Sequence, residues 1–163
     1  MKTPLELIAY IRLVFPPKRF MSAADSNAPQ GIEQSDCVQG LLQVSWLKLT
    51  PERVVRHREC VYFLTPNQVF ACLPAFLHAT VELISRDSSS LFFECIVFLL
   101  GALEPENNSV HAMADVHQRQ AIGLTLELAA VYALKFREGY GYDSSRSALL
   151  REWGNWWIDH LGP

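Results

Sequence analysis

The stretch from Tyr62 to Glu82, YFLTPNQVFACLPAFLHATVE, constrains the fold of this chain more than any other. It begins with a helix start: Thr65 can accept a hydrogen bond from a free backbone amide, Pro66 fits the first helical position, and Gln68 stands where its side chain bonds back to the cap. Apolar residues then recur at helical spacing as far as Ile84. This pattern predicts a central helix with a buried face.

Pro74 lies inside this helical pattern. A proline in that position removes one backbone hydrogen bond and clashes with the carbonyl of Phe70, which costs roughly 3 kcal/mol unless the helix bends. We expect a kink, or two short helices that meet near Leu73. A kink usually lets a helix wrap around a core; the other interpretation is that it shapes a binding groove beside Pro74.

Helical patterns on both sides of the central stretch predict an all-α fold, a compact single-domain bundle of about six helices over residues 1–163 with a proline-kinked central helix. Thr-Pro pairs open two earlier helices, one capped by Thr3 and one capped by Thr50 that runs over residues 51–61. Strand is the alternative for residues 91–103, but that run has a normal length for a helix. Three further helices are expected: one from Cys37 to about Trp46 with Ser35 or Asp36 as its cap, one from a cap at Asp115 to about Phe136, and a last one that begins at Asp143 or Ser144. The last helix carries a stripe of three tryptophans, Trp153, Trp156 and Trp157. Loops are expected over residues 20–32 and 104–114.

Composition excludes several classes of protein. Half of the residues (50%) are hydrophobic and 19% are charged, which excludes a disordered chain. The formal net charge of -3 gives no reason to expect a nucleic-acid partner. The longest apolar run, residues 91–103, is interrupted by Glu94 and is too short to cross a bilayer, so we expect no membrane.

The four cysteines are widely spaced, and each lies in an apolar context. We interpret Cys37, Cys60, Cys72 and Cys95 as buried free thiols, and neither a disulfide framework nor a zinc site is expected. Free thiols are typical of a reducing compartment, which favours a cytoplasmic location.

No phosphate-binding loop, serine elbow, C-x-x-C pair or H-E-x-x-H helix is present in the sequence. His111, Asp115 and His117 fall within seven residues and are the metal candidate, but their spacing alone does not define a coordination site. We interpret His78 as a satisfied, half-buried histidine and Cys72 as inert packing, while the alternatives are a catalytic base and a nucleophile. We therefore expect no metal, no cofactor and no enzymatic activity.

Two clusters have both a functional and a structural interpretation. The three tryptophans of the last helix could form a partner site, but their i, i+3, i+4 spacing is more typical of a core stripe. A second cluster could contact phosphate and is more typical of a solvated helix face; it consists of Arg53, Arg56, His57 and Arg58.

Charge placement is the one uneven feature of the sequence. Lysine and arginine are absent between Arg19 and Lys48 and again between Arg86 and Arg119, and acids occur in both windows. An anionic surface speeds association with a basic protein, whereas the ordinary interpretation is solubilising charge. Glu94, between phenylalanine and cysteine, is expected to be half-buried and structural. The predicted partner-binding residues are Asp25, Glu33, Asp36, Asp87, Glu104, Glu106 and Asp115.

Two segments carry a family resemblance. Phe63-Leu64-Thr65-Pro66, followed by Leu73-Pro74-Ala75-Phe76-Leu77, resembles the F-[LF]-T-P…[YC]-L-P-A-[FY]-L core of a family of small helical bacterial proteins. The residues Ile11-Arg12…Phe15, Trp46 and Gln118…Ala121-Ile122 follow the family's order, whereas the loop over residues 20–32 and the Trp-rich tail depart from it. The family has no accepted activity, and it is similar to immunity proteins, which neutralise toxins delivered between competing bacteria.

The resemblance and the acidic windows together imply a function. We expect a cytoplasmic immunity protein that binds a cognate basic toxin, with a nuclease as the expected toxin class, and neutralises it by occluding its active site. The alternative is a small regulatory or adaptor protein that binds a peptide or ligand in a groove near Pro74.

Overall fold

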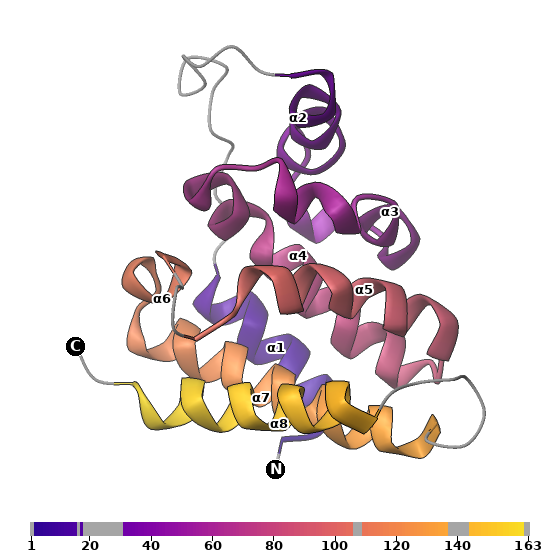
Figure 1. Cartoon of the computed structure of the whole chain (residues 1–163), viewed down its shortest axis with the longest axis vertical. Coiled ribbons are helices and arrows are strands. Elements are labelled where there is room, and N and C mark those ends of the chain that lie inside the picture. Colours follow the sequence, from indigo (N-terminus) through magenta and orange to yellow (C-terminus); the bar gives the residue numbers. More distant parts are fainter. Residues whose placement is uncertain (1, 16, 18–30, 106–108, 137–143, 162–163) are drawn as a thin grey trace.

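Figure 1 shows the computed structural model of the chain, in which residues 2–15, 17, 31–105, 109–136 and 144–161 are described. Every regular element in these residues is helical, which confirms the predicted all-α fold. The α-helices are α1 (Pro4–Val14), α2 (Ile32–Cys37), α3 (Pro51–Arg56), α4 (Pro66–Ser85), α5 (Ser89–Ala102), α6 (Ser109–Met113), α7 (Val116–Ala133) and α8 (Ser144–Asp159). A π-helical turn, η2 (Val38–Leu42), and the 3-10 turns η3 (Trp46–Lys48), η4 (Arg58–Tyr62) and η5 (Leu134–Phe136) connect or extend them.

The start of α4 is the capping box that the sequence predicts. The amide of Gln68 donates to Thr65 Oγ1 at 3.4 Å, and the amide of Thr65 donates to Gln68 Oε1 at 2.9 Å. Pro66 occupies the first turn, where its missing N–H leaves no unsatisfied group. These local contacts fix where the central helix begins.

α4 forms the centre of the bundle. It contacts α1, α3, α5, α6 and α7, and it is buried continuously from Cys72 to Val81. Pro74 lies inside this buried run. The helix nevertheless continues for 20 residues, so the predicted alternative of two short helices meeting near Leu73 is wrong. Packing on all sides holds the helix together across the hydrogen bond that the proline removes.

By length and apolar composition, α4 is also the one described helix that could cross a membrane. Of its apolar window, 72% is buried inside the fold. This burial is typical of the core helix of a soluble protein.

α4 and α5 pack antiparallel along the middle of the core. The rings of Phe76 and Phe98 are stacked with centroids 3.6 Å apart and an interplanar angle of 4°. One turn further, Thr80 donates from Oγ1 to the carbonyl of Phe76 at 2.8 Å and lies 3.3 Å from Cys95 Sγ. The hydroxyl is therefore satisfied although the residue is fully buried.

α7 and α8 form a close antiparallel pair at the base of the bundle in Figure 1. A Cβ atom on Gly123 would lie 2.6 Å from Ile158 Cγ1 and 3.0 Å from the carbonyl oxygen of Gly154. A Cβ atom on Gly154 would in turn lie 3.1 Å from the amide nitrogen of Glu127. The two backbones approach each other because both helices carry glycine at the contact.

The prediction of four free cysteines is wrong for two of them, which lie at the opposite end of the molecule, around α2. Cys37 at the end of α2 and Cys60 in η4 form a disulfide, with their Cα atoms 5.6 Å apart. Cys72 and Cys95 are buried free thiols as expected. The wrong assignment has a physical reason: the two bonded cysteines are 23 residues apart without a motif, and only the tertiary fold brings them together.

Several predicted helix boundaries are also wrong. The helix expected over residues 37–46 begins earlier, at Ile32, and its cap is Gly31, so neither Ser35 nor Asp36 is the cap. The segment continues as the π-helical turn η2, which departs from the regular α-helical period and explains why the apolar residues there keep no single spacing. The helix expected over residues 51–61 ends at Arg56 and resumes as η4. The expected loop over residues 104–114 contains α6. Residues 20–30 of the other predicted loop lie outside the described residues, as does Asp143, one of the two caps expected for the last helix.

The predicted solvated basic face is wrong for two of its four members. His57 is partly buried, and its ring packs closely on Gly40: a Cβ atom on Gly40 would lie 2.3 Å from the imidazole ring. Arg58 forms an ion pair with Glu94, with Nε and Oε2 2.6 Å apart. The Glu94 side chain is 49% exposed, so it is half-buried as predicted, and its ion pair joins α5 to η4.

We predict that Gly123→Ala destabilises the protein by about 1–3 kcal/mol, because overpacking against Ile158 and Gly154 exceeds the gain of about 1 kcal/mol in helix propensity. Urea unfolding measures this difference. Asn155→Ala, at an exposed position of α8, is the control and should be neutral or slightly stabilising. A Gly123→Ala variant as stable as the parent would contradict the close approach.

We also predict that two thiols, those of Cys72 and Cys95, react with an alkylating reagent in guanidinium chloride without reductant, and that all four cysteines react after reduction. Peptide mass mapping should recover Cys37 linked to Cys60. Reduction should lower the free energy of unfolding by about 3 kcal/mol, the value for a loop of this length. Labelling of all four cysteines before reduction would show that the disulfide is absent.

Candidate functional site

The predicted partner-binding acids fall into three groups. Glu33 and Asp36 lie on α2, and Glu104 directly follows α5; all three are exposed. None of the three forms an ion pair with a cation of the described residues. Asp25 and Glu106 lie outside the described residues.

Asp115 and Asp87 form a separate group, because the side chains of both accept hydrogen bonds within the fold. Asp115 caps α7: its Oδ1 accepts from the amides of His117 and Gln118, each at 2.9 Å. Asp87 has a left-handed backbone with φ 54° in the turn between α4 and α5, and its Oδ1 accepts from the Tyr132 hydroxyl at 2.9 Å. Burial, and then the hydrogen bond and charge of Asp87, raise the pKa of Tyr132 to about 12.

Segments from both acidic windows contact the N-terminal end of α4. Gln34 of α2 donates from Nε2 to Gln68 Oε1 of the capping box at 3.1 Å, which ties α2 to this end of the helix. Glu104 approaches the same end, because it lines a pocket together with Pro66 and Val69 of the first turns of α4. Asp87 lies beyond the other end of α4, and a helix of this length spans about 30 Å.

The pocket beside Glu104 has a volume of about 170 Å³ and is open to solvent. Its walls come from η4, the first turns of α4, the end of α5 and the start of α6, and they consist of Val61, Leu64, Pro66, Val69, Gly101, Ala102, Glu104, Ser109 and Val110. Glu104 is the one charged residue in this set. Pro74 is not part of the wall and is buried in the core, so this pocket is not the groove predicted near Pro74.

Two exposed aromatic residues beside this pocket were missed by sequence reasoning. Tyr62 and Phe63 stand between the wall residues Val61 and Leu64 and are 69% and 45% exposed. They belong to the apolar stretch that opens the central segment, and the sequence analysis gave them no role. No local signal separates them from the neighbouring Leu64, which is buried.

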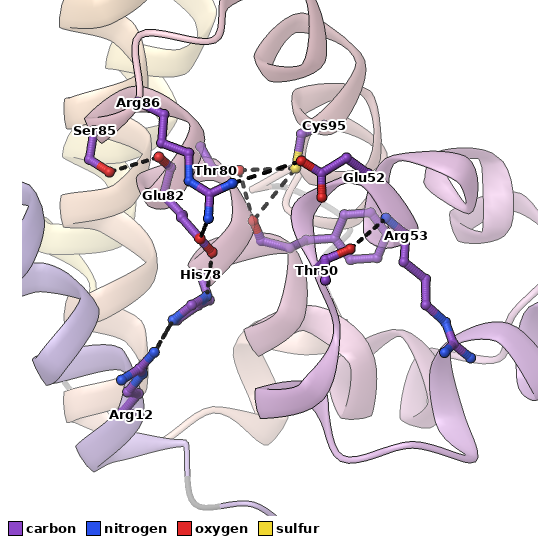
Figure 2. A network of polar contacts seen from close by, with 11 residues as sticks. Arg12, Thr50, Glu52, Arg53, His78, Thr80, Glu82, Ser85, Arg86 and Cys95 are labelled. Atoms are coloured by element: carbon purple, nitrogen blue, oxygen red, sulfur yellow. Dashed lines mark hydrogen bonds and ion pairs between the residues drawn. The ribbon is translucent and has the colours of Figure 1, made fainter.

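A line of polar side chains crosses from α1 to α3 through α4, as Figure 2 shows. Arg12 Nε donates to His78 Nε2 at 3.2 Å, and Arg12 Nη2 lies 2.9 Å from the same nitrogen. Because arginine can only donate, the His78 proton is on Nδ1, which lies 3.6 Å from Glu82 Oε2. Glu82 also pairs with Arg86, whose Nη1 lies 3.8 Å from Glu52.

These contacts define what His78 can do chemically. The side chain is 9% exposed, and its ring packs against Trp46 with centroids 5.8 Å apart. Burial, and then the Arg12 guanidinium, hold the pKa of His78 below its ordinary value, while Glu82 acts in the opposite direction. The lone pair that a general base would use is occupied by Arg12. The structure therefore confirms that the histidine is satisfied, and it is more deeply buried than the half-buried position that was predicted.

The two free thiols have the surroundings of packing groups. Cys72 donates from Sγ to the carbonyl of Val69 at 3.3 Å, and burial raises its pKa. Burial likewise raises the pKa of Cys95 to about 12, although the hydrogen bond with Thr80 acts in the opposite direction. The thiolate form is disfavoured at both positions, as expected for inert buried cysteines.

The predicted metal candidate is not assembled. No group of three metal-ligating side chains comes together within the described residues. His111 packs against Trp156 and Trp157 with centroids 4.9 and 5.1 Å apart, and its Nε2 lies 3.0 Å from the carbonyl of His160. Trp157 is fully buried and donates to the carbonyl of Leu103 at 3.1 Å. At this position the tryptophan stripe is part of the core, as predicted.

Comparison with protein-family models, with curated proteins and with solved structures gave no match. The resemblance to a bacterial family and the function that it implies therefore remain predictions.

We predict that the protein loses stability as the pH falls below about 6.5, the ordinary pKa of histidine. The pKa of His78 and that of His57 are both lowered in the folded state, so the unfolded state binds more protons there and stability falls toward acid. Urea unfolding at a series of pH values measures the slope. His78→Gln should cost about 1–3 kcal/mol at neutral pH and flatten the slope.

His160→Gln, at an exposed histidine directly after the last helix, is the matched control and should keep the parental slope. If His78→Gln keeps that slope as well, buried His78 does not contribute to the acid sensitivity.

Proposed function

We propose that this protein binds and neutralises a basic protein toxin, in the manner of a bacterial immunity protein. The observation that supports this proposal is a set of exposed acids that form no ion pair with the described residues and lie on two segments that contact the N-terminal end of α4. Glu33 and Asp36 reach this end through α2, and Glu104 reaches it beside the pocket. Carboxylates without internal partners are free to attract a basic surface and to orient it during encounter.

The chemistry of a nuclease toxin fits such a surface. An enzyme that acts on nucleic acid presents basic residues to the phosphate backbone. An acidic protein placed on those residues excludes the substrate by occupying the same charges. Neutralisation of this kind requires that the inhibitor bind the toxin tightly and cover its active site. It requires no catalytic group on the inhibitor.

The disulfide bears on where such a protein works. Disulfides persist in oxidising compartments and are rare in the reducing cytoplasm. The bond between Cys37 and Cys60 therefore favours an oxidising compartment over the cytoplasmic location expected from free thiols. A protein that meets an incoming toxin outside the cytoplasm would work under such conditions.

A second candidate function is a regulatory or adaptor protein that binds a peptide. The pocket at the N-terminal end of α4 favours it, since an open pocket beside exposed aromatic residues is typical of a peptide-binding surface. The site for this function would be near Pro66 and not near Pro74.

The proposal is tested by capture from the native cell lysate followed by mass spectrometry. The expected result is one basic protein in stoichiometric amount, which is toxic when expressed alone and harmless when coexpressed with this chain. Capture of a metabolite-binding or adaptor complex, or of no protein whose toxicity the chain relieves, would refute the neutralising function.

With that partner, we predict that the double variant Glu33→Lys, Asp36→Lys lowers the association rate about tenfold or more at low salt, because it reverses two exposed charges on α2. Stopped-flow association kinetics measure this rate. The matched control is Glu152→Lys, Asp159→Lys, which makes the same charge change on exposed positions of α8. Equal rates for the two double variants would contradict the role of α2. Asp115 is unsuitable for this test because it caps α7.

A further inference from the structure

The pocket beside Glu104 is held in shape by several independent contacts. The capping box fixes the first turn of α4, and the disulfide at Cys60 holds η4. Gly101 lets η4 approach α5 closely, since a Cβ atom there would lie 2.8 Å from Val61 Cγ1. The pocket is therefore preformed, and a ligand does not have to order it.

Its size and lining define what can enter. A cavity of about 150 Å³ lined by apolar side chains holds a benzene molecule, so the volume of about 170 Å³ accommodates one aromatic or branched aliphatic side chain. The lining is mixed: five of the nine wall residues are valine, leucine or alanine, but polar atoms contribute more of the accessible surface than apolar atoms do. Tyr62 and Phe63, which are exposed, are adjacent in sequence to two wall residues.

Its charge defines what should accompany the apolar group. Glu104 is the one charged wall residue and forms no ion pair with the described residues. Arg58, the cation of η4, is already paired with Glu94 at 2.6 Å. A ligand with a cation next to its apolar group would therefore meet an unneutralised carboxylate at the edge of the pocket.

We propose that this pocket anchors one large apolar side chain of a basic protein partner, with a neighbouring lysine or arginine of that partner set against Glu104. The identity of the occupant as a protein rests on the proposed function, whereas the chemistry of the pocket does not. A buried apolar anchor in a preformed pocket, surrounded by charge complementarity, is the usual arrangement of an interface hot spot.

The test uses 4-phenylbutylamine as a probe for the apolar group and its cation, with 4-phenylbutanol and 4-phenylbutyrate as neutral and anionic counterparts. Methyl NMR spectra of the full chain report binding. The expected result is a shift of the Val61, Val69 and Val110 signals by the amine, with a dissociation constant on the order of a few millimolar for a ligand of this size. Binding should weaken from amine to alcohol to carboxylate.

Two variants separate the pocket from unspecific binding. Ser109→Phe places a ring at an exposed wall position and should abolish the shifts, while Ser90→Phe, at an exposed position on the first turn of α5, should leave them unchanged. Glu104→Gln should weaken amine binding about two- to fivefold, the range for an exposed ion pair, and should leave alcohol binding unchanged. The spectrum of each variant shows whether it is folded.

The outcomes decide the proposal. No shift, equal binding of the three probes, or shifts that persist in Ser109→Phe would overturn it, as would a captured partner that binds Ser109→Phe as tightly as the parent. If the amine binds as expected but no toxin is captured, the neutralising function fails and the chemistry of the pocket stands. If a toxin is neutralised equally by the parent and by Ser109→Phe, the pocket assignment fails and the function stands.

Discussion

The nearly complete burial of α4 is the constraint on which the rest of the structure depends. A 20-residue helix with apolar side chains around its circumference needs neighbours on every side, and α1, α3, α5 and α7 supply them. This enclosure also tolerates Pro74, because packing compensates for the hydrogen bond that the proline removes. As a consequence, α4 reaches solvent chiefly at its two ends: Thr65 and Pro66 are exposed at one, and Ser85 and Arg86 at the other.

The two ends of α4 are built differently. At the C-terminal end the charges satisfy one another: Arg86 pairs with Glu82 and Glu52, and Asp87 accepts from Tyr132. At the N-terminal end the pocket is open, its carboxylate has no ion-pair partner among the described residues, and two aromatic side chains are exposed. Internal pairing stabilises a fold, whereas unpaired charge and exposed apolar area are features of binding surfaces. The difference therefore favours the N-terminal end as the place where a partner binds.

The parts of the fold that could be predicted from the sequence are those with local causes. The capping boxes at Thr3, Thr65 and Asp115 involve residues three positions apart, so the sequence alone contains them. The disulfide and the π-helical turn depend on contacts across the fold, and both were missed. The acids show the same division. The sequence predicted that Asp115 caps a helix, but only the structure shows that Asp87 accepts a hydrogen bond from Tyr132 while Glu104 forms no ion pair with the described residues.

The position of α2 connects stability with the candidate surface. A helix of 6 residues is too short to be stable alone, so its place depends on tertiary contacts. The described contacts that hold it at α4 and η4 include the disulfide of Cys37 with Cys60 and the hydrogen bond from Gln34 to Gln68. Glu33 and Asp36 therefore keep their position relative to Glu104 through a covalent bond and the capping residue of the central helix. Carboxylates held in place in this way would need no additional ordering if a partner bound them.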